Sequence, residues 1–193
     1  MAPMTAFPRL LLTTTMLLIS AFIHAADVDV TDKIAVCQGC HGGSDSAPIN
    51  ADTPILAGQE YYYLYVQLKD YKAGRRANAV MSGMAAPLSK DEMKALAEHY
   101  SSMEWPTIRS EIDDDLATKG NSALSAGQCS QCHSTYQGDS RVPRLAGQQL
   151  PYLLQTMKDF KNKVRLNSPA KGSLMDSFSD EDLAAMANHL SGL

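Results

Sequence analysis

The sequence lacks an excess of positive charge and, beyond its N-terminus, any long apolar run. Its 193 residues include 21 acidic and 17 basic side chains, which makes nucleic acid an unfavourable partner. No segment after residue 25 is apolar enough to span a bilayer, so we expect contact with a membrane only through partner proteins. A nucleophile with a neighbouring base and a phosphate-binding loop are also missing. These absences argue against a nucleic-acid-binding protein and against an enzyme with its own catalytic side chains.

The N-terminal segment has the order of features that is typical of a secretory signal peptide. A single positive charge, Arg9, precedes a mostly apolar run from Leu10 to Ile23, and small residues follow at Ala25 and Ala26. The apolar run is shorter than the roughly 20 residues that a spanning helix needs. We therefore expect residues 1–25 to be removed on export to the periplasm. An uncleaved membrane anchor is the alternative.

Cysteine is also scarce, and its placement is informative. The four cysteines all belong to two Cys-x-x-Cys-His motifs, at residues 37–41 and 129–133, so no thiol remains for a structural disulfide. On a helix, two thiols three residues apart can both reach one porphyrin edge, and the adjacent histidine can bind the iron. We therefore expect two covalently attached haems c. Their predicted ligands are the thiols of Cys37, Cys40, Cys129 and Cys132 and the imidazoles of His41 and His133.

Zinc binding and thiol–disulfide exchange are the competing interpretations of these motifs. The two Cys-x-x-Cys pairs of a zinc site are usually about 15–20 residues apart, whereas Cys40 and Cys129 stand in different halves of the chain. A thioredoxin-like motif would need a surrounding βαβ pattern, which the sequence does not have. The histidine that completes both motifs favours haem.

The two halves of the chain repeat each other. The segment Pro54–Gln59 (PILAGQ) recurs as Pro143–Gln148 (PRLAGQ), and Asp70–Lys72 recurs as Asp159–Lys161. Between the halves, Trp105-Pro106 and a run of three aspartates interrupt the helical pattern. After the signal peptide at 1–25, the repeat predicts a first domain at 26–103, a linker at 104–115 and a second domain at 116–193.

Each half is predicted to be helical, and no alternating pattern is long enough for a strand. A first helix should carry the motif, at about residues 30–40 and 116–132. A second should follow the repeated Gly-Gln, and a third should start at the capping patterns of Ser89 and Ser179. Three short helices with long loops bury too little apolar surface alone, so a porphyrin must complete each core. The fold class is all-α.

The second axial position of each iron needs a further ligand. Methionines between the second and third helices are placed to reach the opposite haem face, namely Met81 and Met84 in the first half and Met175 in the second. A methionine ligand raises the reduction potential, which suits an electron carrier.

From Val36 to its C-terminus the chain resembles the dihaem cytochromes c4 and the cytochrome subunit of flavocytochrome c sulfide dehydrogenases. The resemblance is carried by Cys-x-x-Cys-His-Gly at 37–42, Pro-Ile-Leu-Ala-Gly-Gln at 54–59, the segment 81–91 and their second-half copies. It implies two tandem class I cytochrome c domains, each with three or more helices around its haem. It also implies a distal methionine eight residues before the helix-capping serine, which is Met81. The carbonyls of Pro54 and Pro143 should contact the proximal histidines.

The second half departs from this pattern. Eight residues before Ser179 stands Lys171, and Met175 is the only methionine of that loop. We predict Met175 as the ligand, because the segment 168–172 can reshape the loop. Lysine ligation or an open iron position is the alternative, and an open position could make the second haem catalytic.

The expected function is electron transfer in the periplasm, without enzymatic activity of the chain's own. Electrons would come from a quinol-oxidising complex or a dehydrogenase and leave to a terminal oxidase or reductase. The alternative is an electron-accepting cytochrome subunit of a flavoprotein dehydrogenase such as sulfide dehydrogenase. In both cases the partners are redox proteins.

Overall fold

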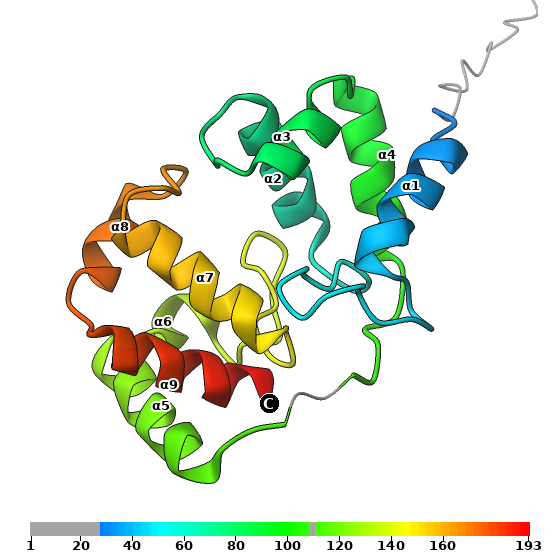
Figure 1. The fold of residues 1–193 in the computed structure, drawn as a ribbon. Coiled ribbons are helices and arrows are strands. Elements are labelled where there is room, and N and C mark those ends of the chain that lie inside the picture. The colour runs from blue at the N-terminus through cyan, green and yellow to red at the C-terminus, as the bar shows by residue number, and fades with distance from the viewer. Residues whose placement is uncertain (1–27, 109–110) are drawn as a thin grey trace, which may run out of the picture.

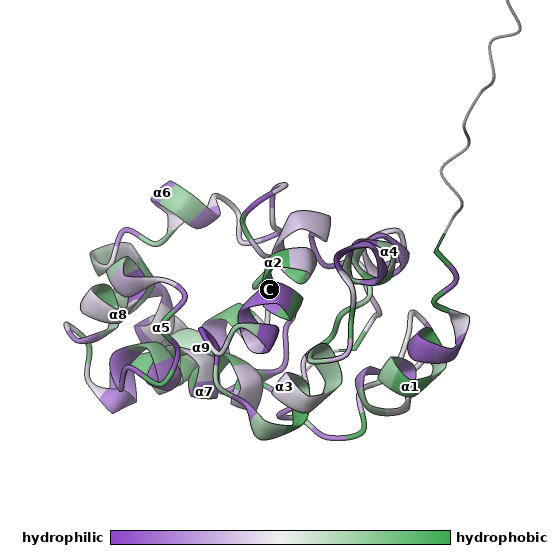
Figure 2. Ribbon diagram, turned by 90° about the horizontal axis from the view of Figure 1, so that it is seen from above, coloured by the Kyte–Doolittle hydropathy of each residue, from purple (hydrophilic) through white to green (hydrophobic). Residues whose placement is uncertain are grey.

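The computed structural model describes residues 28–108 and 111–193. Within these ranges the chain forms helices and isolated β-bridges, so the all-α fold class is confirmed. Figures 1 and 2 show two groups of helices side by side, one from each half of the chain. The first contains α1 (Thr31–His41), α2 (Tyr61–Lys72), α3 (Ala79–Ala85) and α4 (Lys90–Ser101), and the second contains α5 (Asp114–Ala126), α6 (Ser130–His133), α7 (Leu150–Lys161), α8 (Pro169–Met175) and α9 (Asp180–Ser191).

Two sequence expectations concern residues outside these ranges. The predicted signal peptide, residues 1–25, is one of them, and the middle of the predicted linker, residues 109 and 110, is the other. No helix in the described part of the chain is both long and apolar enough to cross a membrane.

The last helix of each half starts where its capping pattern predicts. The Ser89 hydroxyl accepts a hydrogen bond from the Glu92 amide, and the Glu92 carboxylate accepts one from the Ser89 amide. Ser179 and Asp182 form the same pair of bonds at the start of α9. Both capping boxes satisfy amides that the first helical turn leaves free.

The predicted single helix at residues 116–132 is wrong, because the chain breaks it into α5 and α6. Gln128 has a positive φ of 52°, which a helix does not allow. The amide of Cys129 turns back to the carbonyl of Leu124 at 3.1 Å, which closes α5. The second motif is therefore split between a helix end and the short α6, whereas the first motif lies on one continuous helix.

A short helix precedes the last helix of each half, and the apolar periodicity does not predict it. These helices are α3 and α8, with seven residues each. Their local signals are an Asn78 side chain that accepts from the Met81 amide at 2.9 Å, and Pro169 in the first turn of α8. They place residues 81 and 171 at the same point of the two repeats.

Helix packing is closest between α5 and α9. A Cβ atom at Gly120 would clash with the carbonyl of Ala185, so only glycine allows this approach. Figure 2 shows apolar and polar residues mixed along the helices, and the buried apolar side chains form the core of each half. The second-half core contains Leu124, Leu153, Phe160, Met175, Leu183, Met186, Ala187 and Leu190. The first-half core is divided into two smaller clusters around Leu96 and Tyr100.

Candidate haem sites and the interface between them

The first motif lies on α1, which brings its two thiols and its histidine together at the end of the helix. Cys37 is half-buried, Cys40 is exposed, and neither forms a disulfide. Burial raises the pKa of the Cys37 thiol. The two thiols are thus available as a pair on one helix turn, as thioether attachment to one porphyrin requires.

His41 is held in one orientation by a backbone carbonyl. Its Nδ1 lies 2.8 Å from the Pro54 oxygen. A carbonyl only accepts, so Nδ1 donates and Nε2 keeps its lone pair for a metal. Burial lowers the pKa of His41, and the bond to Pro54 opposes this shift only in part. Burial thus favours the neutral imidazole and the Pro54 carbonyl orients it, so the contact implied for Pro54 is confirmed.

The ring of His133 is held by fewer contacts than the ring of His41. It ends α6, and its Nδ1 is buried without a hydrogen-bond partner in the described part of the chain. Burial and the nearby Lys171 ammonium lower the pKa of His133 to about 4, while the Pro143 carbonyl acts in the opposite direction. Pro143 is thus near the ring, but it does not form the well-aligned bond that Pro54 forms with His41. Ser134, which follows His133, has a positive φ of 48°, where the first motif has Gly42.

On the opposite side of the first site, α3 presents the predicted distal methionine. Met81 is the third residue of α3 and is half-buried. Met84 lies one turn further along and is 38% exposed. The cap from Asn78 fixes the backbone of Met81. Met81 therefore remains the predicted ligand of this half.

In the second half, α8 holds both candidates for the distal position. Lys171 is the third residue of the helix and is half-buried, whereas Met175 is the last residue and is buried within the hydrophobic core. The two side chains therefore have different surroundings.

Two glutamines of the repeat join the halves reciprocally. Gln148 accepts from the Ile55 amide at 2.9 Å and donates to the Ile55 carbonyl at 3.0 Å. Its repeat counterpart, Gln59, accepts from the Arg144 amide at 2.8 Å and donates to the Arg144 carbonyl at 3.0 Å. Both glutamines are buried. The repeat alone signals that they are equivalent, but not that they cross between the halves.

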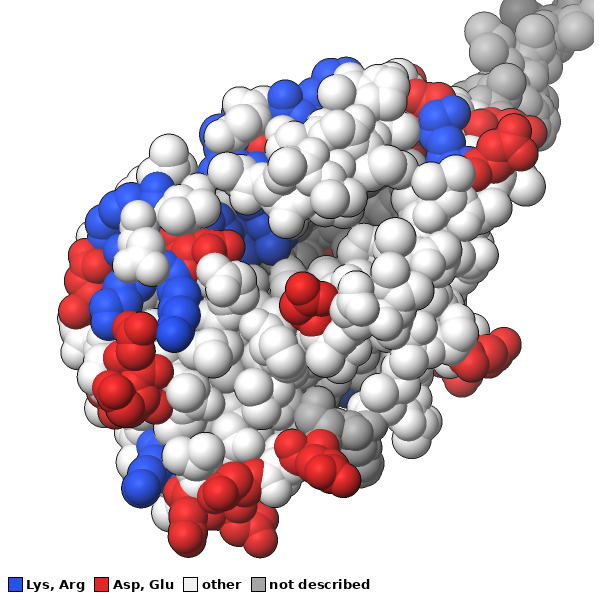
Figure 3. All heavy atoms as spheres, in the orientation of Figure 1, with Lys and Arg blue, Asp and Glu red and all other residues white. Residues whose placement is uncertain are grey.

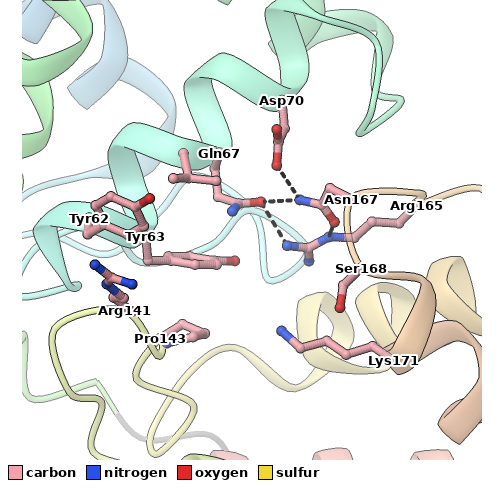
Figure 4. A pocket seen from close by; sticks show the side chains of 11 residues that line it. Tyr62, Tyr63, Gln67, Asp70, Arg141, Pro143, Arg165, Asn167, Ser168 and Lys171 are labelled. Carbon is pink, nitrogen blue, oxygen red and sulfur yellow. Dashed lines mark hydrogen bonds between the residues drawn. The ribbon is translucent and has the colours of Figure 1, made fainter.

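Two buried arginines also meet at this interface, and one of them, Arg165, lines a polar cavity together with Gln67 (Figure 4). Arg76 and Arg165 both donate to the same Gln67 oxygen, at 3.1 and 2.7 Å, and Arg76 also donates to the Tyr152 hydroxyl at 2.9 Å. Neither guanidinium has a carboxylate partner in the described part of the chain. Two buried like charges around one amide oxygen call for an anion. The other residues that line this cavity are Tyr62, Tyr63, Val66, Asp70, Arg141, Pro143, Asn167, Ser168 and Lys171.

Known proteins resemble both halves of the chain together. Cytochrome c4 of Thiocapsa roseopersicina is 36% identical over 174 residues, which cover 82% of this chain and 87% of that protein. The chain belongs to the cytochrome c4 family. The solved structure of cytochrome c4 from Acidithiobacillus ferrooxidans has a TM-score of 0.74 with this chain at 29% identity, and the match covers 82% of this chain and 99% of that one. The all-α fold of two class I cytochrome c domains is thereby confirmed.

Two further matches bear on function. A thiosulfate dehydrogenase electron acceptor of Stutzerimonas stutzeri is 30% identical over 169 residues, covering 81% of this chain and 78% of that protein. The family model for "Cytochrome C oxidase, cbb3-type, subunit III" matches residues 115–190. This cytochrome c4 homologue is an electron-transfer protein with two c-type haems rather than an enzyme.

The residues present fit the two haems. Each half offers two free thiols and a histidine that can bind iron, which is buried in the first half and half-buried in the second. The two interface arginines have no carboxylate partner in the described part of the chain, and the propionate carboxylates of a haem would be chemically suitable partners. The thiols, the histidines and the interface arginines are thus all groups that a covalently bound haem can use, as the two motifs predict.

Proposed function

We propose that this cytochrome c4 homologue is a periplasmic electron carrier with one haem in each of two domains, residues 26–103 and 116–193, joined by the linker 104–115. Residues 1–25 serve as the export signal. The cysteine pairs of both motifs attach the haems, His41 and His133 are the proximal iron ligands, and Met81 is the distal ligand of the first iron. The observation that carries this proposal is the His41 site, where a free thiol pair and a carbonyl-oriented imidazole lie together on α1.

The bound haem supplies one-electron chemistry, since its iron alternates between the ferric and ferrous states. The protein's part is to hold and tune that iron. The Pro54 carbonyl keeps the His41 ring in one orientation. Thioether attachment prevents loss of the cofactor outside the cell. The glutamine pair keeps the two domains in one arrangement, so that an electron entering one domain has a fixed route to the other.

The distribution of charge on the surface suits short-lived complexes with redox partners. Figure 3 shows basic side chains gathered over α7 and α8 and acidic ones toward α5 and α9, with a largely uncharged area beside them. Several of these charges neutralise each other locally, as Lys158 and Lys161 do with Asp180. Electron-transfer partners form small, short-lived interfaces in which rim charges mainly set the association rate. We therefore expect association that weakens moderately with salt.

A second candidate is a dedicated electron acceptor of one dehydrogenase. It is favoured by the relatives that are named thiosulfate dehydrogenase electron acceptors. A flavoprotein dehydrogenase such as sulfide dehydrogenase is another donor of this kind. The free carrier would exchange electrons with several proteins, whereas the dedicated acceptor would bind one dehydrogenase in fixed proportion.

The test is native capture of the full-length, haem-loaded protein from periplasm through a C-terminal affinity tag, followed by reduction assays. A free carrier should elute without a stoichiometric partner and should be reduced by quinol in the presence of a quinol-oxidising complex. A dehydrogenase recovered in equal proportion, and reduction only by that enzyme's substrate, would replace the free-carrier proposal by the dedicated acceptor. A captured protein with an intact N-terminus would contradict cleavage after residue 25.

A further inference from the structure

We propose that the amine of Lys171, and not the thioether of Met175, is the distal iron ligand of the second haem. The inference rests on haem occupancy of the second site. It replaces the sequence-based expectation of Met175 by a nitrogen ligand, which gives the two halves of the protein different iron coordination.

The register of the two short helices is the first argument. In both repeats a seven-residue helix is followed by a capping serine at the same distance, so α3 aligns with α8 when α4 aligns with α9. In this alignment Met81 corresponds to Lys171, the third residue of each helix. Met175 corresponds to Ala85, the last residue. The one-residue insertion of the second repeat falls before α8, between Arg165 and Ser168, and therefore does not shift the helix register.

Burial follows the same correspondence. Met81 and Lys171 are both half-buried, whereas Ala85 and Met175 are both buried, at 0% and 9% exposure. Met175 belongs to one hydrophobic cluster with Phe160 and with residues of α9. The burial of Met175 thus matches that of Ala85, whereas the burial of Lys171 matches that of Met81.

The direction of the Lys171 side chain is the second argument. Figure 4 shows it extending from α8 into the interface cavity, with its amine directed toward Pro143. Pro143 is the residue whose carbonyl approaches the proximal His133. Lys171 thus reaches from the distal helix toward the side of the cavity where the proximal ligand is held.

Lys171 also lacks the partner that a structural lysine would have. It forms no ion pair or hydrogen bond in the described part of the chain, and its amine lies 5.5 Å from the ring centre of Phe160. Two acidic residues near Lys171 form ion pairs with other lysines: Asp176 with Lys163 at 2.6 Å and Asp180 with Lys161 at 2.9 Å. An amine left without an anion in a cavity is available to donate its lone pair.

Ligation requires the neutral amine. One proton leaves Lys171 to solvent, and the freed lone pair forms the bond to iron without any change in oxidation state. A nitrogen donor stabilises ferric iron more than a thioether does, so the second haem should have a lower potential than the first.

The experiment compares three variants of the haem-loaded protein. Lys171→Met supplies the thioether at the proposed position, Lys171→Arg keeps the positive charge but cannot bind iron, and Met175→Leu keeps the core filled without sulfur. The sulfur-to-iron absorption band of the oxidised protein reports methionine ligation. Haem counting after denaturation reports attachment independently, so a protein with fewer than two haems would contradict the haem sites rather than the ligand.

We expect the wild type to show the band of one methionine-ligated haem. Lys171→Met should increase its amplitude about twofold and raise the lower of the two potentials. Lys171→Arg should convert the second haem to a high-spin spectrum, and Met175→Leu should change neither the band nor the potentials. A band that falls to about half in Met175→Leu would overturn the proposal. So would a Lys171→Arg variant with the wild-type spectrum, since the lysine would then act only through its charge.

Discussion

Replacing Gln148 by alanine should loosen the joint between the two domains. The side chain forms three hydrogen bonds, two with the Ile55 backbone at 2.9 and 3.0 Å and one from the Gln149 amide at 3.0 Å. Its removal leaves the buried amide and carbonyl of Ile55 without partners. Each unpaired buried group costs about 1–3 kcal/mol, so the free energy of unfolding should fall by about 2–6 kcal/mol.

The assay is denaturant unfolding of the haem-loaded protein, followed by haem absorbance and by far-ultraviolet circular dichroism. Gln155→Ala is the matched control, because Gln155 is exposed and bonds only to Asp159 on the same helix. Its effect should stay within about 0.5 kcal/mol. Combining Gln148→Ala with Gln59→Ala should cost less than the sum of the single changes, since both act on one interface. Equal effects of Gln148→Ala and the control would refute the reasoning.

Three further changes test individual parts of the account. Changing both Cys37 and Cys40 to alanine should leave one covalently bound haem in denatured protein, and a count of two would contradict the attachment. Met81→Ala should abolish the sulfur-to-iron band and lower the potential of the first haem, whereas a persistent band would place the ligand elsewhere. Gly120→Val should destabilise the second domain by about 1–3 kcal/mol or more, because its side chain clashes with the backbone of α9. Thermal unfolding should show this loss but none for Asn121→Ala on the same helix.

The sequence predicts the two haems because the signals for them are local. Each motif gathers its thiols and its histidine within five consecutive residues, and each capping serine stands beside its partner. The same local patterns do not predict the break between α5 and α6, because it depends on the positive φ of Gln128, a residue type that is common in helices. The spacing of the motif residues therefore predicts haem attachment, whereas the ends of the helices can be located only in the folded structure.

The contacts between the two halves could not be predicted from the sequence, for a different reason. Gln59 and Arg144 bond across 85 positions, and Gln67 and Arg165 across 98. No helical or repeat period predicts such pairs, since they depend on how the domains dock. The distal ligand of the second haem shows the same limit, because an insertion before α8 leaves the loop register open until both helix bounds are known.

We propose above all that this protein carries electrons through two haems that are reversibly oxidised and reduced and that lie in unequal environments. A spectroelectrochemical titration of the haem-loaded wild type tests it most directly, with Met81→Ala titrated beside it. We expect two separate one-electron steps, of which Met81→Ala shifts only the one at higher potential. Two indistinguishable steps, or a shift of the lower step alone, would contradict it.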